Sequence, residues 1–177
     1  MPLFDRIESH ASQDRLERLI EDRLAPGADT AAIDAVIWKL FGERWAVMFT
    51  DLIGFSRHVA EFGIVQFLQT IHISHRLLVP CLERGAGILL KTEGDSMLVI
   101  FRSPGDALHA AIDMQRSVAD YGSRPEAISA FRIRIGVSVG EVVMEGNDAH
   151  GIAAIEAARL EPMAAPLELS PFDGTRR

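Results

Sequence analysis

Two aspartates, Asp51 and Asp95, carry the side chains best placed for chemistry, because each lies at the end of a predicted strand. Asp51 closes the compact apolar segment 45–50, and Asp95 lies at the tip of a hairpin predicted over 88–101. If segment 45–50 neighbours the hairpin, the carboxylates meet at one sheet edge and can share hard divalent ions, Mg²⁺ or Mn²⁺. Two such ions per site serve an in-line attack on phosphorus: one lowers the pKa of the attacking hydroxyl, and the other neutralises a triphosphate.

The segment after Asp51 is compatible with a phosphate ligand. Leu52, Gly54, Phe55 and Ser56 lie in a predicted turn, and the backbone N–H groups of such a turn can face phosphate oxygens. Each aspartate taken alone is better explained as a cap or turn residue, because Asp is common at turns. The pair, and not either residue alone, therefore supports a metal site.

The elements around these residues predict an α/β (α+β) fold with a ferredoxin-like βαββαβ core. Two helices precede the core as an N-terminal helical appendage, which either packs on the same chain or serves in dimerisation and signal transmission. We expect the appendage over 1–43, the core domain over 44–165 and an irregular tail over 166–177. Apolar periodicity predicts helices over 12–24, 33–40, 64–83, 104–121 and 151–161, and further strands over 131–135 and 141–144.

Composition excludes several classes of protein. The 177 residues are 48% apolar, which is sufficient for one buried core, and the net charge of −7 argues against a nucleic-acid or anionic-membrane surface. A single cysteine, Cys81, excludes an internal disulfide and fits a reducing compartment. No signal peptide and no apolar segment of about 20 residues is present, so we expect a soluble, cytoplasmic protein without a membrane span.

Four ordered motifs resemble the catalytic domain of class III adenylate and guanylate cyclases, of the bacterial type. The first metal motif of that family is similar to Val47-Met-Phe-Thr-Asp-Leu-Ile-Gly-Phe-Ser56, and its hairpin is similar to Lys91-Thr-Glu-Gly-Asp95. The next strand, turn and strand resemble Arg134-Ile-Gly-Val-Ser-Val-Gly-Glu-Val143. The last active-site segment resembles Asp148-Ala-His-Gly151 together with Ala157-Ala-Arg-Leu-Glu161. The joint match covers about 45–165 and is far more specific than any one motif.

The resemblance assigns a role to each matching position. Asp51 and Asp95 fall on the two metal carboxylates, and Leu52 falls on the residue whose carbonyl joins one metal. Lys91 and Asp148 fall on the pair that reads the purine edge, in the version that selects adenine. A carboxylate can accept from the adenine amino group while an ammonium donates to a ring nitrogen.

The same resemblance implies the reaction and the assembly. Arg159 falls on the arginine that stabilises the transition state, where a planar guanidinium suits a transferring phosphoryl group. The implied reaction converts ATP into 3′,5′-cyclic AMP and pyrophosphate. In the family the metal carboxylates come from one chain and the purine pair and arginine from another, so a homodimer is implied.

One position departs from the family. Ile155 stands where the family usually has an asparagine that orients the ribose, and loss of one positioning hydrogen bond costs roughly 10²-fold in rate. The sequence also ends before the last strands of the family domain, so we expect a truncated or degenerate member. The alternative function is a catalytically impaired cyclase homology domain that acts as a dimerising or nucleotide-sensing regulatory module.

Other reactive residues indicate less. His72 and His75 are three apart on a predicted helix but have no evident third metal ligand, and His150 lies beside the purine position. Cys81 has only Arg84 as a basic neighbour, which favours a buried, inert thiol. A hydrolase lacks its Gly-x-Ser-x-Gly motif, and a diguanylate cyclase lacks its Gly-Gly-Asp/Glu-Glu-Phe motif.

Overall fold

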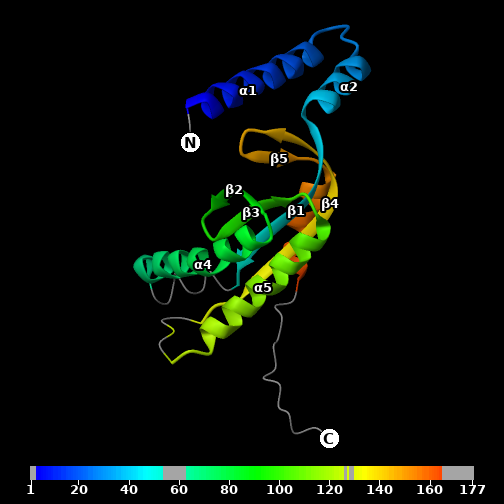
Figure 1. Cartoon of the computed structure of the whole chain (residues 1–177). Helices are drawn as coiled ribbons and strands as arrows, with labels where there is room; N and C mark the ends of the chain where they lie inside the picture. Colours follow the sequence, from blue (N-terminus) through cyan, green and yellow to red (C-terminus); the bar gives the residue numbers. More distant parts are fainter. Residues whose placement is uncertain (1–2, 54–62, 126, 128–129, 165–177) are drawn as a thin grey trace, which may run out of the picture.

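A computed structural model describes residues 3–53, 63–125, 127 and 130–164 (Figure 1). Three of the predicted phosphate-facing residues, Gly54, Phe55 and Ser56, lie outside these ranges. The predicted irregular tail over 166–177 also lies outside them.

Five antiparallel strands form one sheet in the order β2-β3-β1-β4-β5. With the intervening helices, the first four strands follow the order βαββαβ, which confirms the predicted fold class. The strands are β1 (Gly42–Leu52), β2 (Ile88–Glu93), β3 (Ser96–Phe101), β4 (Ile133–Glu145) and β5 (Asp148–His150).

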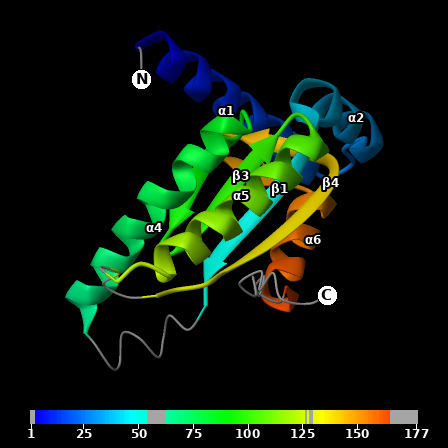
Figure 2. The ribbon, with the colours of Figure 1, turned by 60° about the horizontal axis from the view of Figure 1, so that its bottom comes forward.

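Helices cover both faces of the sheet. In Figure 2, α4 and α5 lie side by side on one face, and α6 lies on the other. Two further helices, α1 and α2, precede β1. The helices are α1 (Leu3–Leu24), α2 (Thr30–Phe41), α4 (Ile64–Arg84), α5 (Pro104–Gly122) and α6 (Ile152–Leu160), and α6 is followed by the 3₁₀ turn η1 (Glu161–Met163).

Burial on both faces explains the continuous apolar sequence of β1. Ala46 and Met48 pack into the cluster beneath α4 and α5, whereas Trp45 and Val47 pack into the cluster beneath α6. A strand covered on one face alternates apolar and polar residues, but a strand covered on both faces is apolar throughout. Met48 and Val47 are fully buried, so β1 is a rigid element at the centre of the domain.

The helix boundaries follow local capping chemistry. The Ser103 hydroxyl accepts a hydrogen bond from the Asp106 N–H at 3.3 Å, and Asp29 accepts one from the Ala32 N–H at 3.0 Å. Gly94, with a φ of 62°, forms the β2–β3 turn as predicted, since glycine adopts this conformation without strain. The first helix is longer than predicted, because it begins at Leu3 rather than near residue 12.

The prediction of two separate strands over 131–135 and 141–144 is wrong. Residues 133–135 and 141–144 both belong to the single strand β4, which pairs with β1 from Gly42↔Val143 to Leu52↔Ile133, and residues 131 and 132 lie before it. The glycines between them permit close packing of α6 rather than a turn. A Cβ on Gly136 would lie 2.5 Å from the backbone nitrogen of Glu161, and one on Gly140 would lie 3.1 Å from Cβ of Ala153.

Candidate active site

Asp51 and Asp95 come together at the ends of two neighbouring strands. Thr50 of β1 pairs with Met97 of β3, so the register next brings Asp51 beside Ser96 and the turn that carries Asp95. The Ser96 hydroxyl donates a hydrogen bond to Oδ1 of Asp51 at 3.1 Å. Because β1 and β3 are interior strands, the acids meet at a strand end inside the sheet and not at its lateral edge.

One oxygen of the Asp95 carboxylate lacks a hydrogen-bond partner among the described residues. This oxygen, Oδ2, is buried. Burial raises the pKa of Asp95 and the nearby charge of Asp51 raises it further, outweighing the backbone N–H groups of Asp95 and Leu52. A buried carboxylate oxygen without a partner, next to a second carboxylate, fits a divalent cation with oxygen ligands.

Arg134 of β4 supplies a positive charge to this acid pair. Its Nη2 donates to Oδ2 of Asp51 at 2.7 Å, and its Nε lies 2.9 Å from Oε1 of Glu161. The second contact is an ion pair without an aligned hydrogen bond, because both buried atoms lack a hydrogen-bond partner in the described structure. Asp51 raises the pKa of Arg134, mainly through the hydrogen bond.

Glu161 places a third carboxyl group near the two aspartates. Burial raises its pKa, and the charges of Asp51 and Asp95 add to this effect against the opposing influence of Arg134. The sequence interpretation missed both Arg134 and Glu161. The sequence assigns Arg134 no role beyond its place in a motif, because its position across from Asp51 in the β1–β4 ladder follows only from the strand pairing.

The remaining predicted metal ligand is Leu52, the last residue of β1, whose side chain is buried. Within the described ranges, no group of three or more His, Cys, Asp and Glu side chains is arranged to hold a metal ion. The predicted carboxylate set therefore consists of Asp51 and Asp95 alone.

A second polar pair joins the two lateral edges of the sheet. Nζ of Lys91, in β2, donates to Oδ2 of Asp148, in β5, at 2.6 Å. A register shift between Leu89 and Lys91 marks a β-bulge, a feature that re-aims the side chains that follow it. The structure thus brings together the two residues that the resemblance assigns to the purine.

Each member of this pair favours the charged form of the other. Hydrogen bonds to Asp148 and then to Glu93 raise the pKa of Lys91. Burial acts to raise the pKa of Asp148, but the hydrogen bonds from Lys91 and from the Ala149 N–H outweigh it and lower that pKa. The ammonium and the carboxylate are therefore both charged at neutral pH, as hydrogen bonding to a purine edge requires.

Arg159 lies apart from both pairs. Its side chain is exposed on α6, and no ion pair involves it in the part of the chain that the structure describes. Ile155, four residues earlier on the same helix, is 54% exposed, whereas Ala153, Ala154 and Ala157 face the sheet. Arg159 and Ile155 thus lie on the solvent side of α6.

The secondary candidates belong to no cluster of metal-binding side chains in the described part of the chain. Burial and the proximity of His72 lower the pKa of His75, and the two residues find no third protein ligand in the described ranges. Cys81 is buried, with its Sγ 3.4 Å from the Ser117 hydroxyl. Nε2 of His150 lies 2.8 Å from Oε2 of Glu145.

Comparison with known proteins identifies the family. The model of the adenylate and guanylate cyclase catalytic domain matches residues 42–151, which contain both polar pairs and all five strands of the sheet. This chain belongs to that family, and the resemblance of its motifs is confirmed. No described helix is long and apolar enough to cross a lipid bilayer.

Individual relatives agree with this assignment. The chain is 27% identical over 129 residues to a putative adenylate cyclase 3 of Rhizobium meliloti, and 25% identical over 126 residues to an adenylate cyclase of Streptomyces coelicolor. These matches cover 73% and 71% of the chain but only 22% and 32% of the relatives. A crystal structure of an adenylate/guanylate cyclase/hydrolase from Silicibacter pomeroyi is similar at 30% identity and a TM-score of 0.62, over 71% of this chain and 74% of that one.

Proposed function

We propose that residues 44–165 form an adenylate cyclase domain that converts ATP into 3′,5′-cyclic AMP and pyrophosphate with two divalent metal ions. In this proposal residues 1–43 are the N-terminal appendage, of which Gly42 and Glu43 already belong to β1, and 166–177 are the tail. The observation that carries the proposal is the simultaneous presence of two polar pairs, Asp51 with Asp95 and Lys91 with Asp148. The first pair suits cations that bind phosphate, and the second suits a purine.

The Asp51 and Asp95 carboxylates and the Leu52 carbonyl are the groups that would hold Mg²⁺ or Mn²⁺. When bound, such ions lower the pKa of a hydroxyl and neutralise phosphate charge. The 3′-hydroxyl gives its proton to water and its oxygen forms a bond to the α-phosphorus. The bond from that phosphorus to the bridging oxygen of the β-phosphate breaks, and pyrophosphate leaves with the electron pair. Arg134 already neutralises part of the carboxylate charge, so it lowers the repulsion between the acid pair and an incoming triphosphate.

Lys91 and Asp148 support ATP as the substrate. The Asp148 carboxylate can accept from the 6-amino group of adenine, and the Lys91 ammonium can donate to a ring nitrogen. Guanine presents a carbonyl at the same position, which a carboxylate repels. Nζ of Lys91 and Oδ2 of Asp148 are hydrogen-bonded to each other at 2.6 Å. Hydrogen bonds to the base must therefore replace part of this contact.

The position of Arg159 supports a homodimer with composite sites. Its guanidinium is exposed on α6, so it is free to reach a triphosphate held partly by another chain. Five N–H donors in a planar fork match the oxygens of a transferring phosphoryl group. Each composite site would then combine the acid pair of one chain with the purine pair and Arg159 of its partner.

One observation favours a second function, the regulatory module. Ile155 is 54% exposed on the same side of α6 as Arg159, four residues before it. An isoleucine can neither donate nor accept a hydrogen bond, so this surface lacks a group to orient the ribose. A domain with this defect could still dimerise and bind nucleotide.

A single assay separates the two functions. We expect the chain, in its natural full-length context, to produce cyclic AMP from ATP with Mn²⁺, and Asp95→Asn to abolish production. Asp120→Asn is the matched control, because it removes a carboxylate from the exposed end of α5. Binding of ATP and Mn²⁺ without any cyclic AMP from the parent protein would overturn the enzymatic function and establish the regulatory one.

A further inference from the structure

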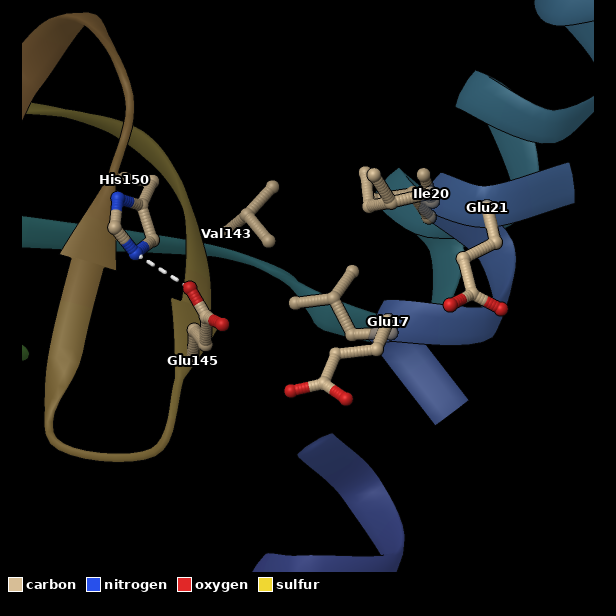
Figure 3. Close-up of a pocket in the computed structure, with 8 residues that line it drawn as sticks. Glu17, Ile20, Glu21, Val143, Glu145 and His150 are labelled. Carbon is tan, nitrogen blue, oxygen red and sulfur yellow. Dashed lines mark ion pairs between the residues drawn. The ribbon is translucent and has the colours of Figure 1, made fainter. Parts of the chain in front are cut away.

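A cavity of about 610 Å³ lies between the helical appendage and the hairpin formed by β4 and β5 (Figure 3). Its volume falls within the range of about 300–1,000 Å³ that is usual for small-molecule sites. The cavity involves neither the acid pair nor Lys91 and Asp148, so it is separate from the proposed active site.

Apolar side chains from three elements line much of this cavity. Leu16 of α1, Ile37 of α2 and Val143 of β4 pack together in a small cluster, and Leu16 and Ile37 are only 6% and 7% exposed. Ile20, one turn after Leu16, also lines the cavity but remains 44% exposed. This lining favours an apolar ligand body, because contact with it removes further apolar surface from water.

The polar lining of the cavity is predominantly acidic. Glu17 and Glu21 lie one turn apart on α1, and Glu145 and His150 lie on the hairpin across the cavity, as Figure 3 shows. His150 contacts Glu145 at 2.8 Å, whereas no ion pair within the described residues involves Glu17 or Glu21. Two carboxylates beside an apolar surface attract a positive charge and repel a negative one.

From this combination we infer that the cavity binds a small organic cation with an apolar body, such as an aromatic or alicyclic amine in its ammonium form. The apolar body lies against Ile20, Ile37 and Val143, and the ammonium group lies between the carboxylates of Glu17 and Glu21. A neutral apolar molecule lacks the electrostatic attraction to the two carboxylates, and an anion is repelled by them.

The position of the cavity gives such a ligand a regulatory role. His150 and Asp148 belong to the same strand, β5, which has only 3 residues. The apolar body of the ligand contacts Val143, which pairs with His150 in the β4–β5 ladder, so an occupant lies directly beside the strand that carries the proposed purine-reading carboxylate. This role rests on the proposed function, whereas binding of the cation does not.

Binding can be measured without turnover. We would titrate the full chain with 1-pyrenemethylammonium and with the matched anion 1-pyrenecarboxylate, and follow fluorescence anisotropy. We expect saturable binding of the cation, and affinity for the anion at least about tenfold weaker. Raising the salt concentration should reduce the difference, because exposed charges are screened.

Variants then locate the site. We expect the double variant Glu17→Gln/Glu21→Gln to bind the cation about tenfold more weakly. The control Asp14→Asn/Asp22→Asn removes the same charge from exposed positions of the same helix and should leave binding unchanged. Ile20→Lys places a cation on the cavity wall and should also weaken binding. Circular dichroism would verify that each variant retains the helices and the thermal unfolding of the parent.

Three results would overturn the inference: no saturable binding of the cation, equal affinities for cation and anion, or equal losses in the two double variants. The regulatory role has its own test, the affinity for ATP measured by calorimetry with and without a saturating cation. An unchanged affinity for ATP would overturn that role and leave the binding site standing. Absence of cyclic AMP production would refute the proposed function without affecting the binding measurements.

Discussion

Lys91 and Asp148 are in direct contact, 2.6 Å apart, although β2 and β5 occupy opposite lateral edges of the five-stranded sheet. A flat sheet would keep these strands four strand spacings apart, about 19 Å. The sheet must therefore curve around the face covered by α6, and the contact between Lys91 and Asp148 joins the two edges of the curved sheet.

This contact leads to a prediction about base selection. Asp148→Ala removes the proposed acceptor for the adenine amino group, so we expect the preference of the variant for ATP over GTP to be lower than that of the parent by about tenfold or more. Competition kinetics with both nucleotides, compared as kcat/KM, measures the effect. Glu93→Gln is the control, because Glu93 also contacts Lys91, at 3.1 Å, but is 73% exposed. Equal use of both nucleotides by the parent, unchanged in Asp148→Ala, would show that another group reads the base.

The same contact predicts a dependence of stability on pH. The pKa of Asp148 is lowered in the folded chain, so its contribution to stability is present above its unfolded value, 3.8, and is lost as the pH falls through the folded value. We expect Asp148→Asn to lower the free energy of unfolding at pH 7 by less than about 1 kcal/mol, because a third of the side chain is exposed. Thermal unfolding at a series of pH values should show the difference shrinking below pH 3.8. A constant difference across that range would contradict the assignment.

Asp95 should behave in the opposite way. Burial and the Asp51 charge raise its pKa, so its ionised form destabilises the metal-free fold. We expect Asp95→Asn to raise stability without divalent ions by about 1 kcal/mol, and to lose the stabilisation that Mn²⁺ gives the parent. Calorimetric scans with and without Mn²⁺ measure both effects. Stabilisation of the variant by Mn²⁺ to the same extent as the parent would place the metal elsewhere.

Gly136 should not tolerate a side chain. A Cβ at this position would overlap the carbonyl oxygen of Ala157 and lie 2.5 Å from the backbone nitrogen of Glu161. We expect Gly136→Ala to destabilise the domain by about 1–3 kcal/mol, as overpacking does. Gly105→Ala, in the first turn of α5, is the control and should be neutral or stabilising, since its Cβ would meet only Ser103 Oγ at 3.5 Å. Chemical denaturation measures the free energy of unfolding of both variants, and equal values for the two would contradict the prediction.

Ile155 should be the main chemical defect of the α6 surface. We expect Ile155→Asn to raise kcat with little change in affinity for ATP, because the added hydrogen bond serves mainly the transition state. The variant should keep the metal requirement and the preference for ATP. An unchanged rate in Ile155→Asn, in a protein that Arg159→Ala inactivates, would indicate that another group orients the ribose.

The sequence predicted the elements whose signals are local. The apolar segment of β1, the hairpin turn that carries Asp95 and the start of α5 at residue 104 each follow from neighbouring residues. The structure contains all three, although β1 is longer than the predicted segment 45–50. The prediction of two strands in place of β4 failed because a glycine within an apolar segment is compatible with two structures. It can form a turn, or it can lie within a strand where another element approaches closely. Only the packing of α6 distinguishes them.

The residues of the candidate site divide in the same way, into those that local motifs identify and those whose role depends on the folded structure. Asp51, Asp95, Lys91 and Asp148 belong to local motifs and could be named in advance. Arg134 and Glu161 could not, because their involvement depends on the β1–β4 register and on where α6 ends. Ion pairs between residues far apart in the chain follow from the folded geometry, which a linear pattern does not contain.

The close packing of α6 on β4 has a consequence for cooperativity. At Gly136 no side chain separates β4 from α6, the helix that carries Arg159. The two backbones are in direct contact, so no side chain between them can adjust its conformation when one of them moves. The same strand carries Arg134, bound to Asp51. In a dimer of composite sites, Arg134 of β4 would belong to one active site and Arg159, on the helix packed against β4, to the other. A displacement caused by nucleotide binding at one site would then be transmitted to the other through the backbone of β4.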